Sequence, residues 1–250
     1  MGEGNFTEQS DLEVLRRLSI MLAVFAAVCL MAGASRMVPA AWQLQPFGDV
    51  LRVREALSMF VFAPAIGVLF WLIVRCVGKG STSVVVQVLM VLAIYFIACG
   101  MGMHDSFNRM RAVYPKRMLP PDVWRTMVYF DDQLGHWVFF GGFVLGTWVV
   151  GIQQVLTPLE KNMGWRWTCG FVLICMALLW VMLTNLWDEY PNTLVDICVI
   201  VLAAFVPLIV HLAFNRRVGL LRLPLLLVIY PACFGSVAGT LIRWRLQGKI

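Results

Sequence analysis

Charged residues are scarce in this sequence. Asp, Glu, Lys and Arg make up 14% of the 250 residues, against about 25% in a typical soluble domain, and 60% of the residues are hydrophobic. The mean hydropathy of +0.80 excludes a soluble globular domain and a disordered chain. The net charge of +6 does not indicate a nucleic-acid binder, because the Lys and Arg residues lie in short segments between apolar runs, where they face anionic lipid headgroups. We therefore expect an integral membrane protein with no nucleic-acid partner.

Cysteine pairs are also absent. None of the seven cysteines is part of a CxxC pair, and all of them lie in or beside apolar runs. The sequence therefore excludes a zinc knuckle, and it indicates small buried thiols in place of a disulfide framework.

Seven apolar segments are long enough to cross a bilayer, whose core needs about 20 apolar residues per helix. They are residues 18–34, 56–74, 83–103, 137–156, 167–186, 194–214 and 221–242. The first segment also resembles a signal peptide, but the acidic residues before it and the lack of a small-x-small cleavage site favour a retained helix. No linker or low-complexity tract divides the chain. We therefore predict an all-α fold, a compact seven-helix bundle that forms a single integral-membrane domain over residues 1–250.

The longest polar segment, residues 105–130, separates the third and fourth apolar segments. After the pair Pro120 and Pro121, residues 122–128 have the pattern of a short capped amphipathic helix, which we expect to lie at the membrane interface. An odd number of spans places the two termini on opposite sides of the membrane. The Lys and Arg residues of the short loops favour a cytoplasmic N-terminus.

Acidic residues and histidines gather on the membrane face opposite the N-terminus. Four consecutive helix ends on that face carry a carboxylate or an imidazole, and the residues are His104, Asp132 and His136, Asp188 and Glu189, and Asp196. Residues four apart share a face of an α-helix, so Asp132 and His136 should point into one site and Asp131 toward water. Asp196 needs a partner, because an acid inside an apolar helix costs about 2.5–3.5 kcal/mol on insertion scales.

These side chains predict a polar site at the membrane interface. Imidazole and carboxylate groups suit a divalent metal, with zinc as the first candidate, and the predicted ligands are His104, His136, Asp132 and Asp196. The same groups could work without a metal as a general acid and base, and the predicted catalytic carboxylates are Asp132, Asp196, Asp188 and Glu189. The plainer interpretation is that these acids end helices in water, where they pair with nearby arginines or are favoured by a helix dipole.

The expected function is an integral-membrane enzyme that acts on a lipid or isoprenoid substrate at the interface, by metal-dependent hydrolysis or by acid–base catalysis. One alternative is a proton- or cation-coupled transporter in which the same acids titrate. Another is a non-catalytic membrane subunit of a larger complex. Membrane lipids are expected partners. The GxxxG spacings Gly142–Gly146 and Gly235–Gly239 allow close helix packing, within the chain, in a homodimer or with another membrane protein.

Signatures of several membrane-enzyme families are missing. The sequence has no Asp-Gly-x-x-Ala-Arg run of the CDP-alcohol phosphotransferases and no paired HxxxH boxes of the membrane desaturases. Seven helices with scattered His and Asp resemble the ceramidase and adiponectin-receptor hydrolases. The sequence departs from that group in its last apolar segment, which contains no histidine where the group has an HxxxH pair.

Overall fold

The computed structural model describes residues 3–35, 52–80, 82–186 and 193–248. This part of the chain has no β-strand and contains seven helices that are long and apolar enough to cross a membrane. The seven spans are Asp11–Ala34, Val53–Val77, Val84–Val113, Pro121–Leu156, Trp165–Thr184, Leu194–Phe214 and Pro224–Leu246. Each overlaps one predicted segment, so the prediction of an all-α, seven-span membrane bundle is confirmed.

Two of the spans are built from several consecutive helical elements. The second span joins α2 (Val53–Leu57), the π-helix η3 (Ser58–Phe62) and α3 (Ala63–Val77). The fourth joins α5 (Pro121–Val128), the π-helix η5 (Tyr129–Gly135) and α6 (His136–Leu156). The other long helices are α1 (Glu3–Ser35), α4 (Val84–Val113), α7 (Trp165–Asn185), α8 (Thr193–Phe214) and α9 (Pro224–Leu246), and the short 3-10 turns are η4 (Lys116–Met118) and η6 (Leu220–Arg222).

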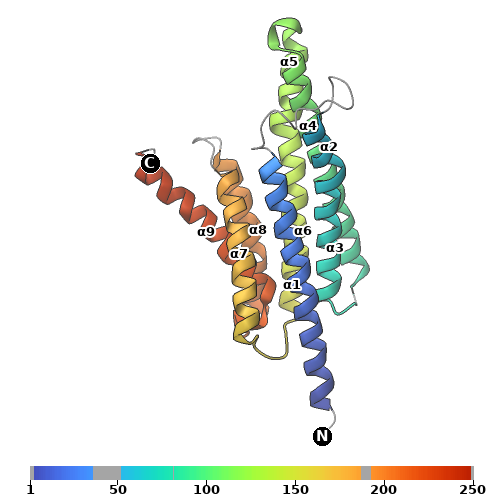
Figure 1. Ribbon diagram of the computed structural model, residues 1–250, viewed down its shortest axis with the longest axis vertical. Helices are drawn as coiled ribbons and strands as arrows, with labels where there is room; N and C mark the ends of the chain where they lie inside the picture. The colour runs from blue at the N-terminus through green and yellow to red at the C-terminus, as the bar shows by residue number, and fades with distance from the viewer. Residues whose placement is uncertain (1–2, 36–51, 81, 187–192, 249–250) are drawn as a thin grey trace.

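The chain runs up and down the bundle, so that α1 begins at one end and α9 ends on the side toward the other end, leaning away from the bundle (Figure 1). We call the end at which α1 begins the N-terminal face. It also carries the connections from α3 to α4, from α6 to α7 and from α8 to α9. The hairpin of α4 and α5 marks the opposite face. Helix α6 is central, because it packs against α3, α4, α8 and α9, while α1 packs against α3 and α7.

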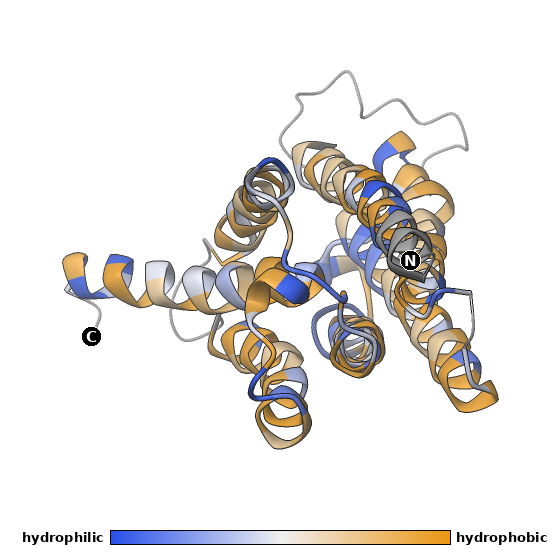
Figure 2. Ribbon diagram, turned by 90° about the horizontal axis from the view of Figure 1, so that it is seen from below, coloured by the Kyte–Doolittle hydropathy of each residue, from blue (hydrophilic) through white to orange (hydrophobic). Residues whose placement is uncertain are grey.

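Apolar residues predominate on the long helices (Figure 2), where some are buried inside the bundle and others are exposed on its outer surface. Leu18, Met90 and Ile97 are buried between helices, and other large apolar residues on the long helices are exposed. An exposed apolar surface of this extent is what lipid requires of a membrane protein. The seven cysteines are free thiols, but Cys169 and Cys198 face outward, so the expectation of buried thiols is wrong for these two.

Residues 105–130 are mostly helical, and the predicted interfacial loop is wrong. Nothing breaks the helix after the apolar part of α4 ends, so α4 continues to Val113, two residues before Pro115. Helix α5 starts at Pro121, a residue that suits the first turn of a helix. The short helix predicted at 122–128 exists, but it continues through η5 into α6 and does not lie flat. Together α4 and α5 form a hairpin that projects beyond the neighbouring helices (Figure 1).

The contact between α4 and α6 brings backbone against backbone. A Cβ atom added at Gly100 would lie 2.3 Å from the backbone nitrogen of Phe139, and one added at Gly142 would lie 2.6 Å from a backbone nitrogen of α4. Cβ atoms do not pack that closely in proteins, so only glycine permits this approach. The same contact includes His104, whose backbone nitrogen would lie 3.0 Å from a Cβ atom at Gly135.

Both GxxxG pairs lie in helix contacts within the chain. Gly142 faces α4, and a Cβ atom added at Gly146 would lie 3.5 Å from a phenylalanine ring of α3. On α9, Cβ atoms added at Gly235 and Gly239 would lie 3.3 and 3.0 Å from leucine side chains of α7. These glycines therefore serve the packing of the monomer. A partner protein or homodimer stays a prediction, and on these faces it would have to displace α4 or α7.

Hydrogen bonds tie the connections of the N-terminal face together. Asp11 on α1 accepts a hydrogen bond from the backbone N–H of Glu160 at 2.8 Å, and its other carboxylate oxygen lies 3.4 Å from Nζ of Lys79. Nε of Arg222 donates to the carbonyl oxygen of Leu159 at 2.6 Å. The charge of Lys79, in the α3–α4 connection, is therefore paired with the carboxylate of Asp11 on α1.

Candidate functional site

The central contact of the candidate site joins α4 to η5. Nδ1 of His104 lies 2.8 Å from Oδ1 of Asp131 and 3.3 Å from the backbone carbonyl oxygen of the same residue. The Asp131 side chain is 2% exposed, so this carboxylate has left water and depends on its protein partners. The stacked rings of Phe107 and Phe130, with centroids 4.9 Å apart, hold the two elements together beside it.

Arg111 is the second partner of the buried carboxylate. Its Nη1 atom lies 2.6 Å from Oδ2 of Asp131 and 2.8 Å from a carboxylate oxygen of Asp132. Its guanidinium carbon lies 5.6 Å from the ring centroid of Trp124 on α5, a cation–π distance. One arginine therefore links α4, α5 and η5.

A second imidazole lies against the first. The ring centroids of His104 and His136 are 4.5 Å apart with an angle of 35° between the planes. Nδ1 of His136 lies 3.2 Å from the carbonyl oxygen of Asp132, so this nitrogen is placed to donate a hydrogen bond. Within the part of the chain that the structure describes, neither Nε2 atom has a hydrogen-bond partner, which leaves both available to a third molecule.

The histidine pair is suited to holding one proton. Asp131 is the carboxylate in contact with His104, and Arg111 pairs with the same carboxylate. A second imidazolium would place two positive rings in contact, which a low-dielectric site disfavours. The buried carboxylate faces His104, so it favours the proton on that ring.

The prediction that Asp132 points inward and Asp131 toward water is wrong. The Asp131 side chain is 2% exposed and that of Asp132 is 49% exposed. Both residues lie in η5, whose π-helical i→i+5 hydrogen bonds widen the turn. The four-residue spacing of an α-helix therefore no longer tells which side chains share a face. The Asp132 carboxylate contacts Arg111, and its backbone carbonyl oxygen contacts Nδ1 of His136.

Asp196 lies deeper in the bundle than the histidines. The indole nitrogen of Trp148 on α6 donates to the carbonyl oxygen of Leu202 on α8 at 2.9 Å. Because helical side chains lean toward the start of their helix, Leu202 lies between the depth of Trp148 and about one turn nearer the start of α6. The two helices run in the same direction, so counting back along both places Asp196 about one to two turns deeper than His136.

The predicted metal ligands are only partly assembled. The structure brings His104 and His136 together, leaves Asp132 on Arg111 and places Asp196 apart. Over residues 3–35, 52–80, 82–186 and 193–248, it groups no three His, Cys, Asp or Glu side chains in a way that could hold a metal ion. Asp188 and Glu189 lie outside the described residues, so both stay predictions. What the structure does assemble is a pair of imidazoles with a buried carboxylate.

Sequence reasoning included Arg111 only among the nearby arginines that could pair with these acids, and it assigned Asp131 to water. Arg111 follows His104 by seven residues, which is two helical turns, so both side chains lie on one face of α4. A histidine and an arginine on one face of a helix predict that a carboxylate from a neighbouring element packs against that face. No comparable signal distinguished Asp131 from Asp132, because the choice depends on the π-helical turn.

No protein-family model, no curated protein and no solved structure matches the chain. The geometry of the site is therefore the basis on which a function can be assigned.

Proposed function

We propose that the chain is an integral-membrane enzyme that hydrolyses a lipid or isoprenoid substrate by general acid–base catalysis, with His136 as the base and His104 as the acid. The observation that supports this proposal is the contact of the His104 ring with the buried Asp131 on one side and with the His136 ring on the other. Two titratable groups in one site with different partners are suited to opposite roles in proton transfer.

Each imidazole is oriented through its Nδ1 atom. His136 donates from Nδ1 to the carbonyl oxygen of Asp132, which leaves the lone pair of Nε2 to accept a proton from water. His104 is held by the carboxylate of Asp131, which stabilises the imidazolium form and leaves its Nε2–H to donate. Arg111 fixes the carboxylate in turn, so it is a positioning residue.

The reaction balances with water as the only co-reactant. Nε2 of His136 takes a proton from water, and the hydroxide oxygen bonds to the carbonyl carbon of an ester or amide. The bond from that carbon to the leaving oxygen or nitrogen breaks as the leaving atom takes the proton from Nε2 of His104. The proton then passes from one ring to the other, which restores the starting state with one proton on the pair.

The depth of the site supports a substrate at the membrane surface. The apolar part of α4 ends just before His104, and the charged hairpin begins immediately after it. Ester, amide and phosphate groups of membrane lipids lie at this boundary between hydrocarbon and water. A lipid could therefore present its polar linkage to the histidines while its chains stay in the bilayer.

Proton-coupled transport is the second candidate. It is favoured by the same contact between α4 and α6, because one proton shared by two imidazoles and a carboxylate is also what a proton relay needs. The two functions differ in the effect of losing the histidines, which is either loss of a lipid product or loss of proton movement.

Loss of either imidazole is expected to slow lipid turnover about 10²–10⁴-fold, the usual contribution of a general acid or base. We would reconstitute the wild type, His104→Gln and His136→Gln in vesicles of a total lipid extract and follow all lipid classes by mass spectrometry. The matched control is His211→Gln, since this third histidine lies near the far end of α8 and contacts the carbonyl oxygen of Val218.

Two outcomes would overturn the enzyme proposal. One is that no lipid class changes with the wild type, and the other is that the His104 and His136 variants turn lipid over as fast as the wild type. A pH-sensitive dye inside the same vesicles tests the second candidate. Proton uptake that needs both histidines, with no change in any lipid, would assign the site to transport.

Metal content provides an independent prediction. After washing with a chelator, the purified protein is expected to hold no stoichiometric divalent metal that depends on His104 and His136, because the site supplies two imidazoles and its buried carboxylate is already paired with Arg111. Elemental analysis of the wild type and the two His→Gln variants measures this. A near-stoichiometric metal that both variants lose would replace the metal-free mechanism with a metal site.

A further inference from the structure

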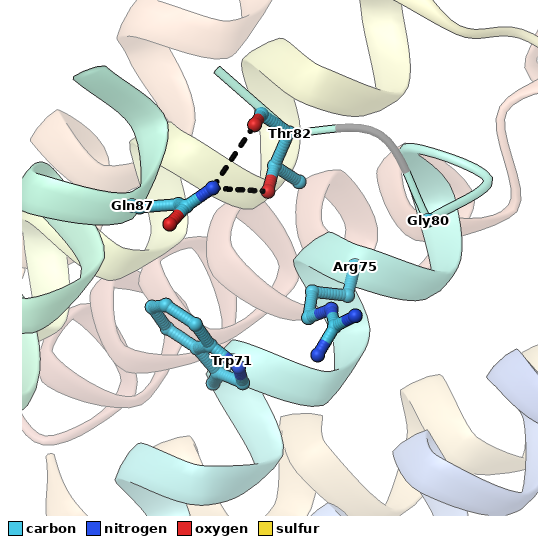
Figure 3. Close-up of a pocket in the computed structure, with 5 residues that line it drawn as sticks. All are labelled: Trp71, Arg75, Gly80, Thr82 and Gln87. Carbon is cyan, nitrogen blue, oxygen red and sulfur yellow. Dashed lines mark hydrogen bonds between the residues drawn. The ribbon is translucent and has the colours of Figure 1, made fainter. Parts of the chain in front are cut away.

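A cavity of about 430 Å³ opens on the N-terminal face, between the end of α3 and the start of α4. It is lined by Trp71 and Arg75 of α3, by Gly80 and Thr82 of the connection, and by Gln87 of α4. Figure 3 shows that Trp71 and Arg75 are one helical turn apart and that Thr82 and Gln87 lie across from them. The cavity is at the end of the bundle opposite the two histidines.

The lining offers hydrogen-bond donors and no carboxylate. Arg75 contributes a guanidinium and Trp71 an indole N–H. Gln87 donates to the carbonyl oxygen of Thr82 at 3.1 Å and to its hydroxyl oxygen at 3.4 Å, so the hydroxyl proton of Thr82 is left to donate elsewhere. A planar guanidinium beside neutral donors is suited to the oxygens of a phosphate.

The positive charge of Arg75 is not neutralised by a protein acid in the described part of the chain. Its neighbour Lys79 is paired with Asp11, and Arg17 of α1 is paired with Glu13 at 2.7 Å. The Arg75 side chain itself is exposed at the cavity. A cation that the fold leaves available at a cavity mouth is expected to attract an anion.

An exposed apolar surface continues from the cavity toward the middle of the bundle. Val68 lies one turn deeper than Trp71 on α3, and Val91 lies one turn deeper than Gln87 on α4, and each is 56% exposed. Tryptophan is itself typical of the depth at which headgroups meet hydrocarbon. A molecule bound here would therefore have a polar end in the cavity and an apolar end on α3 and α4.

We propose that this cavity binds the phosphate of an anionic phospholipid headgroup, with the acyl chains along the exposed apolar surfaces of α3 and α4. Arg75 provides the charge, and Trp71 and Thr82 provide neutral donors. The absence of a carboxylate from the lining disfavours the choline group of a zwitterionic lipid. The site is separate from the histidine pair, so its test and the test of the proposed enzyme are independent.

The test is the affinity of the full-length protein for defined lipids, measured by native mass spectrometry in detergent. The probes are phosphatidylglycerol, phosphatidylcholine and inorganic phosphate. The wild type is expected to bind one phosphatidylglycerol more tightly than phosphatidylcholine. Arg75→Gln is expected to weaken phosphatidylglycerol binding about tenfold, with Arg75→Lys intermediate, because it keeps the charge and loses the planar fork.

The control is Arg16→Gln, which removes an equal charge from an exposed arginine on the same face but outside the cavity lining, and it should leave the affinity unchanged. The proposal is overturned if Arg75→Gln binds phosphatidylglycerol as the wild type does, or if Arg16→Gln loses as much affinity. Inorganic phosphate that competes fully with phosphatidylglycerol at millimolar concentration would also overturn it, because the site would then belong to a free anion.

Discussion

Asp131→Asn is expected to lower the free energy of unfolding by about 3 kcal/mol, the low end of the range for breaking a buried ion pair, because Arg111 keeps its contact with Asp132. The change leaves the shape of the side chain intact and removes the charge that faces both His104 and Arg111. Reversible unfolding in mixed micelles, followed by circular dichroism, measures the loss.

The matched control is the neighbouring residue. Asp132→Asn should cost less than about 1 kcal/mol, because a pair with one half-exposed member contributes little. An equal loss in the two variants would contradict the burial difference between Asp131 and Asp132. So would a larger loss in Asp132→Asn, which is the result that simple α-helical spacing predicts.

Gly142→Ala is expected to lower the free energy of unfolding by about 2–3 kcal/mol, because the added methyl group would overlap backbone atoms of α4 and the helices would have to separate. Gly141→Ala, one residue away, meets nothing within 4 Å. It should be neutral or stabilising by up to about 1 kcal/mol, because alanine favours the helix over glycine.

The same unfolding assay compares both glycine variants with the wild type. The pair has equal chemistry and nearly equal position, so the difference between them isolates the contact of α4 with α6. Indistinguishable stabilities for Gly141→Ala and Gly142→Ala would show that the two helices are not in backbone contact there. Separation of the helices should also move His104 away from His136, so we expect Gly142→Ala to lose activity as well as stability.

Hydropathy was sufficient to locate the seven spans, because a bilayer demands long apolar runs and leaves few other interpretations. It could not identify the hairpin of residues 105–130, since a polar helix and a polar loop have the same hydropathy. The readable signal there was the lack of any helix breaker before Pro115. The sequence thus contained more about this segment than its polarity.

The sequence was sufficient to predict which helix ends form the candidate site. It was not sufficient to predict which side chains of those helices point into it. His104 and His136 end and begin apolar segments on one membrane face, and the structure puts their rings in contact. The orientation of Asp131 depends on a π-helical turn, and the depth of Asp196 depends on how α8 slides against α6 at Trp148. Both are set by tertiary packing, which hydrophobic periodicity does not encode.

The projecting hairpin allows the orientation of the bundle in a membrane to be determined by a reagent added to one side. Lys116 and Arg117 lie exposed in η4 at its tip, beyond the ends of the neighbouring helices (Figure 1). A protease or an amine reagent that does not cross membranes would reach them in sealed vesicles from one side only. That side is also the compartment that borders the two histidines, so one cut in the hairpin identifies the aqueous space that supplies their water and their protons.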